Sequence, residues 1–465
     1  MLGKTLAIKV LNEGLSTGAD YSEIYEDHSS SYSISCENGK IEQTISSTRN
    51  GVGIRLLKDN RTVYGYTNDL SQKGLMTLVS SLNKSFNGER IKEVNKLDKI
   101  KYKNRNEITN SYLDVNKDKI RDLVKIGYDE ISKLNNPKIV RTIISFSYQH
   151  EDVSVFNSKG KYFNRVQEFG RMGFLVIVAD KNGFETGFSG PGCQQDISFF
   201  TEEMIRENAK NTALTALKML GAKECPSGKM PVVIGSGWGG VLFHESCGHP
   251  LEASSISRKL SCFNDQEGKY IASPLVNAVD DSTIPHAWGS VDIDDEGNLG
   301  TRRQLIKDGI LQDYMIDDFN GRRMNREGNG ACRRQNYRFV PTSRMSNTYI
   351  DNGTSTKEEI IAATKLGLYA VGFNGGSVDP TTGEFNFGCS EAYIIRDGKI
   401  AEPVKGATLI GKGNEILKQI DMVGNDLDLG QGMCGASSGS IRTNVGQPTI
   451  RVKEILVGGR GGKLE

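Results

Sequence analysis

The order helix, strands joined by tight turns, helix occurs twice within the first 222 residues of the chain. Apolar side chains at helical spacing predict helices over 2–16 and 70–86, and again over 117–134 and 201–220. Between the helices of each pair, apolar and polar residues alternate as they do in half-buried antiparallel strands. In the second unit these strands are predicted at 139–147, 152–157 and 171–179. Because strands and helices do not alternate one for one, this order favours an α+β fold.

Tight turns separate the predicted strands. Asn38-Gly39 lies between two runs of alternating apolar and polar residues. Asn-Gly in this setting is the strongest short-range signal for a hairpin, because a type I′ turn needs positive φ at both central residues. Asp59-Asn60 predicts the next turn. The first unit is therefore expected to contain an antiparallel meander.

Changes in composition divide the chain into four parts. We expect an N-terminal α+β subdomain over 1–86, a linker over 87–110, a middle α+β subdomain over 111–222 and a β-rich C-terminal domain over 228–465. Seven basic and two acidic residues lie between positions 90 and 105 of the linker. One aromatic residue, Tyr102, lies among them, which is little for base stacking, so we interpret the linker as a solvated connector.

Charge and hydropathy argue against two broad classes of protein. The chain has 58 Lys+Arg and 57 Asp+Glu, a formal net charge of +1, whereas nucleic-acid-binding proteins are usually strongly basic. No stretch approaches the roughly 18 consecutive apolar residues of a transmembrane helix, and the N-terminal residues lack the apolar region of a secretory signal. We therefore expect a cytoplasmic protein with no nucleic-acid or membrane partner. Its eight cysteines are expected to be mostly reduced.

The strongest chemical signal is an HExxxH motif formed by His244, Glu245 and His249, in a chain with five histidines. In the commoner HExxH motif, histidines four positions apart lie about 40° apart around a helix and face one metal ion. Five positions correspond to about 140°, so a regular helix cannot present both rings to one ion. A helix that ends at Gly248, with His249 held extended by Pro250, would solve this, and so would a π-bulge. Glu245 is then the expected general base.

A peptidase zinc site needs a third protein ligand, and the residues alone leave several candidates. The candidates are His28, His150, His286, the carboxylates and the cysteines. Cys434 stands out because the glycines around it would let the backbone of a loop approach a site closely. Cys247 points away from His244 on a helix, so it would serve only in a closed structural site with four protein ligands.

A competing motif, Gly235-x-Gly237-x-x-Gly240, follows a predicted strand and resembles a dinucleotide-binding fingerprint. That fingerprint also needs a second strand after the helix, with an acidic residue about 20 positions on. Here the helix runs into Gly248 and Pro250, and a polar, loop-like segment follows. The dinucleotide interpretation is therefore disfavoured.

Several blocks that run in order through residues 230–450 resemble the TldD/PmbA metallopeptidases, specifically the catalytic TldD-type subunit. The blocks are 244–253, 289–297, 333–337, 341–348, 403–411, 433–435 and 446–448. The N-terminal half resembles the family more loosely, through its order of elements and its length. The resemblance implies a helix-and-antiparallel-strand N-terminal region of two subdomains and a β-rich C-terminal domain that carries the metal site.

The same resemblance implies one Zn²⁺ per chain, held by His244, His249 and Cys434, with Glu245 as the catalytic glutamate. It implies hydrolysis of peptide bonds in unfolded or extended peptides, in the processing of peptide precursors and the degradation of small labile proteins. It also implies a homodimer, or a heterodimer with a PmbA/TldE-type subunit that lacks HExxxH. Two alternatives stay open: a non-catalytic subunit with structural zinc closed by Cys247, and, less favoured, a dinucleotide-binding oxidoreductase.

Overall fold

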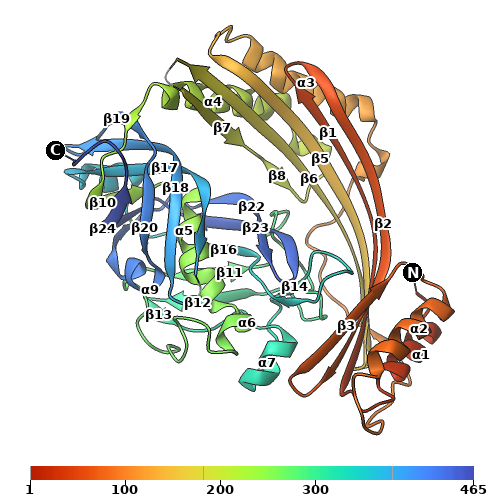
Figure 1. The fold of residues 1–465 in the computed structure, drawn as a ribbon. Helices are drawn as coiled ribbons and strands as arrows, with labels where there is room; N and C mark the ends of the chain where they lie inside the picture. The colour runs from red at the N-terminus through yellow and green to blue at the C-terminus, as the bar shows by residue number, and fades with distance from the viewer. Residues whose placement is uncertain (1, 182, 380, 465) are drawn as a thin grey trace.

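A long, curved, mainly antiparallel sheet wraps around a β-rich C-terminal part in the computed structural model, which describes residues 2–181, 183–379 and 381–464 (Figure 1). The sheet comes from the first half of the chain and the β-rich part from the second half. The predicted α+β class, with its β-rich C-terminal domain, is confirmed.

The N-terminal sheet has the strand order β3-β2-β1-β5-β6-β4, and β7 and β8 also pair with β6. Its strands are β1 (Tyr21–Glu37), β2 (Lys40–Lys58), β3 (Arg61–Thr67), β4 (Asp98–Lys99), β5 (Ile139–Asn157), β6 (Lys161–Asp180), β7 (Gly183–Ser189) and β8 (Gly192–Cys193). The predicted hairpin at Asn38-Gly39 joins β1 to β2, and Asp59-Asn60 joins β2 to β3. β1 also pairs with β5 along most of its length. The two predicted subdomains therefore share one sheet.

The sheet packs against two separate cores, each built mainly but not wholly from one predicted subdomain. Helices α1 (Lys4–Gly14) and α2 (Gln72–Asn83) cover one end of the sheet, and α3 (Lys117–Ser132) and α4 (Glu202–Leu220) cover the other (Figure 1). Polar caps fix where these helices begin: Ser71 accepts a hydrogen bond from the backbone of Gly74, and Thr201 one from Met204. Within the described ranges, no helix combines the length and apolar character needed to cross a membrane.

The second unit differs from its predicted strand pattern. The segments predicted separately at 139–147 and 152–157 form one strand of 19 residues, β5, and the segment predicted at 171–179 is the second half of β6. The prediction of a break between residues 147 and 152 was wrong, because the polar residues at the centre of β5 continue the strand and do not form a turn. Gln149 and Glu151 face the C-terminal part and bind Arg442 there.

The predicted linker, 87–110, has little regular structure, but it is not simply solvated. Val94 and Leu97 are buried in the first core, and β4 adds to the edge of β6. Arg105 forms an ion pair of 2.9 Å with Asp292, which belongs to the C-terminal part. The segment therefore helps to hold the two parts of the molecule together.

Two large sheets, a two-stranded sheet of β14 and β15, and a central helical segment make up the described C-terminal part. The larger sheet has the order β17-β10-β24-β20-β18-β19-β9, with β21 on β24, and the smaller has the order β13-β12-β11-β16-β23-β22. The larger sheet contains β9 (Lys223–Glu224), β10 (Gly228–Ile234), β17 (Leu366–Val378), β18 (Glu384–Arg396), β19 (Lys399–Lys405), β20 (Thr408–Lys412), β21 (Ile420–Val423) and β24 (Ile450–Gly458). The smaller contains β11 (Ala278–Asp281), β12 (Arg302–Lys307), β13 (Ile310–Leu311), β16 (Asn347–Ile350), β22 (Asp428–Ala436) and β23 (Gly439–Gln447). The remaining elements are α5 (Val241–Phe243), α6 (Ala253–Ile256), α7 (Asp318–Met324), α8 (Lys357–Ala362), α9 (Gly413–Ile416), β14 (Cys332–Arg333) and β15 (Thr342–Ser343).

Buried ion pairs join the sheet to the C-terminal part. Arg55 of β2 binds Glu23 of β1 at 2.7 Å and Glu296 of the C-terminal part at 2.5 Å, and all three side chains are almost fully buried. Arg334 also reaches Glu23, at 2.6 Å. Partnered in this way, the charges avoid the large cost of burial alone. They fix the position of the sheet relative to the hairpin β22–β23, which projects toward its concave face (Figure 1).

Candidate metal centre

The HExxxH motif lies on a widened helical turn. After α5 the chain forms a π-helical turn over His244–Gly248, in which the backbone N–H of His249 donates to the carbonyl of His244. This five-residue hydrogen bond replaces the four-residue bond of an α-helix and brings positions 244 and 249 to the same side. The two imidazole rings lie with centroids 5.0 Å apart and planes at 86°. The π-bulge, one of the two predicted solutions, is confirmed.

The alternative prediction, an extended His249 before Pro250, was wrong. His249 is helical, with φ −58° and ψ −44°, and it begins the 3₁₀ turn His249–Leu251. Proline is tolerated there because the first residues of a helical turn need no N–H donor. The restriction that proline places on the preceding residue is a preference, and the surrounding packing overrides it here.

Close packing leaves no room for side chains around the π-turn. A Cβ atom on Gly248 would lie 2.3 Å from the sulfur of Met345, and one on Gly413 would lie 2.0 Å from the carbonyl oxygen of Ser246. Glycine is therefore required at position 413, where the contact is with backbone, and a side chain at position 248 would have to displace that of Met345. The tight contacts also hold the turn in one place, which the two histidines need if they are to share a ligand.

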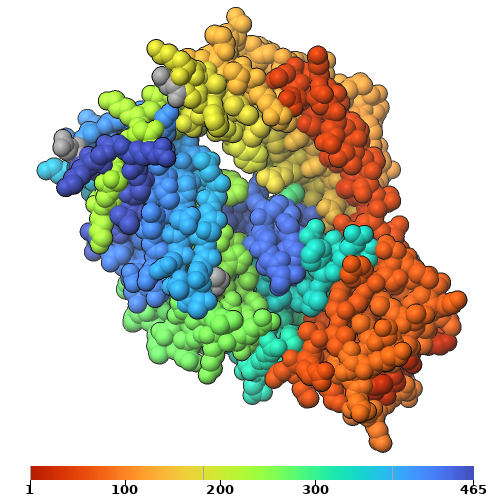
Figure 2. Space-filling view, viewed as in Figure 1, coloured from red at the N-terminus to blue at the C-terminus, as the bar shows by residue number. Residues whose placement is uncertain are grey.

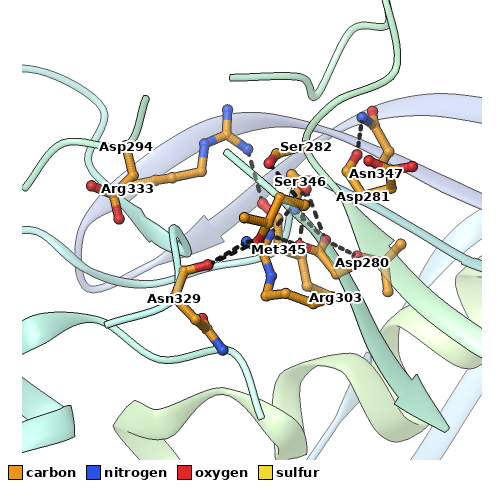
Figure 3. A network of polar contacts seen from close by, with 12 residues as sticks. Asp280, Asp281, Ser282, Asp294, Arg303, Asn329, Arg333, Met345, Ser346 and Asn347 are labelled. Carbon is orange, nitrogen blue, oxygen red and sulfur yellow. Dashed lines mark hydrogen bonds and ion pairs between the residues drawn. The ribbon is translucent and has the colours of Figure 1, made fainter. Parts of the chain in front are cut away.

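A polar network fixes the segment that packs behind the turn (Figure 3). Asp280 of β11 accepts hydrogen bonds from the backbone of Ser346 at 2.6 Å and from Thr348 at 2.8 Å, and it pairs with Arg303. Asn347 reaches the carbonyl oxygen of Asp281 at 2.6 Å. These bonds set the register of β16 and, with it, the position of Met345 against the metal centre.

Cys434 supplies the third donor atom. Its sulfur lies 3.2 Å from Nε2 of His249, and the donor atoms of His244, His249 and Cys434 all lie within 4.8 Å of one another. Cys434 was expected in a loop, but it lies on β22 and pairs with Ile441 of β23. Burial raises the pKa of the Cys434 thiol, but the two histidines lower it by more than burial raises it. The pKa therefore lies well below its usual value. The thiolate, which binds metals, is thereby favoured.

These three residues fit a zinc ion. Zinc takes imidazole nitrogen at about 2.0–2.1 Å and thiolate sulfur at about 2.3 Å, so an imidazole nitrogen and a thiolate sulfur on one ion lie at most about 4.4 Å apart. The 3.2 Å between the sulfur of Cys434 and Nε2 of His249 is within that limit, and the donor atom of His244 lies within 4.8 Å of both. Nδ1 of His244 is buried and has no hydrogen-bond partner among the described residues. A bound ion or its ligands would supply that missing partner.

Glu245 lies beside the three donors and is not one of the clustered ligands. Its carboxylate is 3.8 Å from Nε2 of His249, and its side chain is 21% exposed. It lines the same groove as the histidines. A carboxylate in this place can exchange a proton with a water or substrate atom held near the three donors.

Two positioning residues escaped the sequence analysis. Glu252 places a carboxylate oxygen 3.4 Å from Nδ1 of His249, the nitrogen that faces away from Cys434. A metal-bound histidine usually donates its second N–H to such a carboxylate, which fixes its ring and tautomer. Burial lowers the pKa of His249, but Glu252 and Cys434 raise it above its usual value. The spacing of three residues between His249 and Glu252 was the available signal.

Arg344 is the second positioning residue. Its fully buried guanidinium donates to the carbonyl of Cys434 at 2.5 Å, to Ser438 at 2.8 Å and to the carbonyl of Gly439 at 2.9 Å. The same guanidinium lies 3.9 Å from Glu252. Arg344 therefore ties the end of the hairpin β22–β23 to the residue that orients His249. Its neighbours in the sequence give no sign of this role.

The other candidate ligands lie elsewhere. His28 binds Glu26 at 2.7 Å, His150 binds Glu168 at 2.8 Å, and His286 contacts the carbonyl of Gln194 at 3.0 Å. Cys247 is fully buried among apolar side chains, and burial raises its pKa well above the usual value. Within the described part of the chain, no fourth His, Cys, Asp or Glu joins the cluster, so the closed structural site through Cys247 is not supported.

The glycines of the competing motif have a packing role. A Cβ atom on Gly240 would lie 2.3 Å from the backbone nitrogen of Gly446 on β23, and Gly237 has a positive φ of 68°. They let the segment before the metal centre lie directly on the smaller sheet. The strand that a dinucleotide fold needs does not follow; the next strand, β11, begins at Ala278.

A groove of about 1310 Å³ leads to the three donors. It lies between the region of β7 and β8, the second half of β17, and β22, where the space-filling view is hollowed (Figure 2). β22 is the last strand of its sheet, with an isolated bridge between Leu429 and Gly237, and β17 pairs with β10 over Leu368–Ala370. Part of β22 and the second half of β17 therefore present open strand edges to the groove. A Cβ atom on Gly435 would meet nothing within 4 Å.

Comparison with known proteins gives a consistent result. Residues 227–459 match the family model described as "PmbA/TldA metallopeptidase C-terminal domain", and residues 22–84 match "PmbA/TldA metallopeptidase domain 1". A metalloprotease TldD homolog of Buchnera aphidicola is 36% identical over 450 residues, covering 95% of this chain and 93% of the relative. A zinc metalloprotease TldD homolog of Saccharolobus solfataricus is 25% identical over 358 residues, covering 73% and 79%. The crystal structure of TldE from Thermococcus kodakarensis has the same fold, with a TM-score of 0.75, 17% identity and coverage of 97% and 99%.

Proposed function

Because this chain belongs to the PmbA/TldD family of metallopeptidases, we propose that it is a zinc-dependent enzyme that hydrolyses peptide bonds in unfolded or extended peptides. The observation that carries this proposal is the convergence of His244, His249 and Cys434, with Glu245 beside them at the end of an open groove. Three protein ligands leave a fourth position free, as catalytic rather than structural zinc sites do.

One zinc ion per chain would be held by His244, His249 and Cys434. Bound there, zinc would polarise a scissile carbonyl and make a water molecule acidic near neutral pH. The carboxylate of Glu245 accepts the proton of the attacking water and returns it to the nitrogen of the leaving amine. Glu252 holds the ring of His249 in place through Nδ1, and Arg344 holds the backbone of Cys434.

The groove favours an extended substrate. A peptide that lies between β22 and the second half of β17 can pair with an open strand edge through its own backbone. Binding of this kind depends little on side chains, and a folded protein offers few segments free to join an edge. This supports unfolded or extended peptides as the substrates, in precursor processing and in the removal of small labile proteins.

Assembly and location are part of the same proposal. The chain would act in the cytoplasm as a homodimer, or as a heterodimer with a PmbA/TldE-type subunit. Its preserved HExxxH motif makes it the active member of such a pair. Purification of the chain alone and with a candidate partner, followed by light scattering, distinguishes the two assemblies.

The direct test is Glu245→Gln, assayed for zinc content and for cleavage of an unstructured peptide. We expect about one zinc per chain in both the variant and the unchanged protein, and a loss of cleavage of at least 100-fold in the variant, because general-base catalysis contributes about 10²–10⁴. Glu267→Gln, at an exposed glutamate outside the groove, is the matched control. A Glu245→Gln protein that cleaves peptide at the unchanged rate would remove Glu245 from the mechanism.

A further inference from the structure

A second cavity, of about 230 Å³, lies beside the hairpin β22–β23, between β14 and the concave face of the N-terminal sheet. Met433, next to the predicted zinc ligand Cys434, lines both this cavity and the groove. Five arginines and two acidic residues line the cavity: Arg49, Arg165, Arg333, Arg334, Arg442, Glu151 and Asp295. A polar cavity with this excess of positive charge has a different chemistry from the groove.

Four of the five arginines have a carboxylate partner. Arg49 pairs with Asp27 at 2.8 Å, Arg165 with Asp295 at 2.9 Å, Arg334 with Glu23 at 2.6 Å, and Arg442 with Glu151. Three of these pairs join the N-terminal sheet to the C-terminal part, and the pair of Arg49 and Asp27 joins β2 to β1 within the sheet. Their charges are therefore compensated within the protein and leave no net charge for a ligand.

Arg333 is the exception. It is buried, and among the described residues no carboxylate lies within ion-pair distance of it. One nitrogen, Nη1, donates to the carbonyls of Met345 at 2.8 Å and Arg442 at 2.7 Å. Figure 3 shows the other terminal nitrogen directed away from this network. In the described part of the chain, Nε and Nη2 therefore have no acceptor.

The surroundings make this charge costly. Burial lowers the pKa of Arg333 to about 9, and the positive charges of Arg442, Arg344 and Arg165 act in the same direction against Asp295. Nη1 and Nε of Arg334 are also buried without an acceptor in the described ranges. A buried cation and several unused N–H donors around one cavity are the complement of an anion.

We propose that this cavity binds a small oxyanion, a carboxylate or a phosphate, through the free side of the Arg333 guanidinium. The planar fork of donors on arginine matches two oxygens of either anion. At about 30 Å³ per water molecule, the cavity has room for such a group. The site is independent of the proposed peptidase chemistry, because none of the three donor residues or Glu245 lines it.

Titration of inorganic phosphate into the metal-loaded protein, followed by calorimetry, tests the site. We expect saturable binding that is weakened about tenfold or more by Arg333→Gln, which keeps an N–H donor for the two carbonyls but removes the charge. Glu151→Gln removes a negative charge from the cavity wall and is expected to strengthen binding severalfold. Arg302→Gln, at an exposed arginine outside the cavity, should bind like the unchanged protein.

Two further measurements identify the ligand and its place. Phosphate binding should persist in Cys434→Ser, which separates this cavity from the metal centre. An acetylated dipeptide with a free C-terminus should displace phosphate if the natural ligand is a peptide carboxylate, and the same dipeptide as its amide should not. Displacement by neither dipeptide would assign the site to a free inorganic anion.

Three outcomes would overturn the proposal. The first is the absence of saturable binding of both phosphate and the dipeptide acid. The second is binding that neither Arg333→Gln nor Glu151→Gln changes, provided both variants melt at temperatures close to that of the unchanged protein. The third applies if Arg333→Gln fails to fold. Phosphate binding in Glu151→Gln that is weaker than, or equal to, that of the unchanged protein would then contradict a positively charged site.

Discussion

The metal centre and the interface between the sheet and the C-terminal part both gather buried charged groups, but they satisfy them differently. At the interface, Arg55 lies within 2.7 Å of two carboxylates, those of Glu23 and Glu296. At the metal centre, His249 and Cys434 place their donor atoms 3.2 Å apart with no protein cation between them. The Arg55 pairs compensate their charges within the protein, whereas the metal centre is arranged for an ion that the chain does not supply.

The hairpin β22–β23 belongs to both regions. Cys434 takes part in the metal centre, and Arg442, on the paired strand, binds Gln149 and Glu151 of the N-terminal sheet. A change at the interface can therefore displace a zinc ligand without touching it. We therefore expect changes at the metal centre to affect zinc binding more than stability. Changes at the interface should affect stability more than zinc binding.

The largest effect is expected from Cys434→Ser. A hydroxyl is a poor substitute for thiolate as a zinc ligand, so zinc should fall from about one per chain to little, measured by elemental analysis. Cys247→Ser is the matched control: it should keep its zinc and lose about 1–3 kcal/mol of stability, since it buries a hydroxyl among apolar side chains. Full zinc in Cys434→Ser would place the third ligand elsewhere.

The interface should respond in the opposite way. Arg55→Met leaves Glu23 and Glu296 buried with less compensation, and breaking such a pair costs about 3–5 kcal/mol. Urea unfolding measures this loss, and zinc per folded chain should stay near one. Arg61→Met, at an exposed arginine on the neighbouring strand, should change the free energy of unfolding by no more than about 0.5 kcal/mol. Equal stability of the two variants would contradict the structural role of the Arg55 pairs.

Glu252→Gln tests a part of the metal centre that does not touch the ion. Replacing an outer carboxylate of this kind typically weakens zinc binding about 10- to 100-fold, because the histidine ring loses its orientation. Competition with a chelator measures the affinity, and the fold should remain intact. Unchanged affinity would show that the 3.4 Å contact with His249 does not position the ring.

Local signals in the sequence predicted the first hairpin and the four N-terminal helices correctly, because each depends on neighbouring residues. The Asn38-Gly39 hairpin and the four N-terminal helices are confirmed within a few residues. The shared sheet could not be predicted in this way, since β1 pairs with β5 more than 100 positions further along the chain. Polar residues at the centre of β5 suggested a break in the strand. Their partner, Arg442, is almost 300 positions away, so no neighbouring residue showed that they are paired within the fold.

In the candidate site, too, the sequence predicted what depends on neighbouring residues and not what depends on long-range contacts. His244, Glu245 and His249 form one motif, and the required geometry narrowed the turn to two structures, of which the π-turn is the one observed. The position of Cys434 against His249 depends on the pairing of β22 with β23 and on Arg344. No spacing in the sequence encodes those contacts, so the residues alone left the third ligand open.

The smallest effect is expected at His150, which lies away from both the metal centre and the Arg55 pairs. Its hydrogen bond to Glu168 raises the pKa of His150, and the hydrogen bonds that Glu168 accepts lower the pKa of that carboxylate. The stability due to a histidine with a raised pKa is fully present below about pH 6.5, its unfolded value, and is lost as pH rises through the folded value.

His150→Gln should therefore cost at most about 1 kcal/mol near pH 6, because the pair is partly exposed, and progressively less at higher pH. Urea unfolding of the variant and the unchanged protein at several pH values between about 6 and 9 gives the difference directly. The carboxylate of Glu168 has the opposite pH dependence. The stability that it contributes is lost as pH falls through its lowered folded pKa. A difference between the two proteins that stays constant with pH would mean that His150 stabilises the sheet by packing alone.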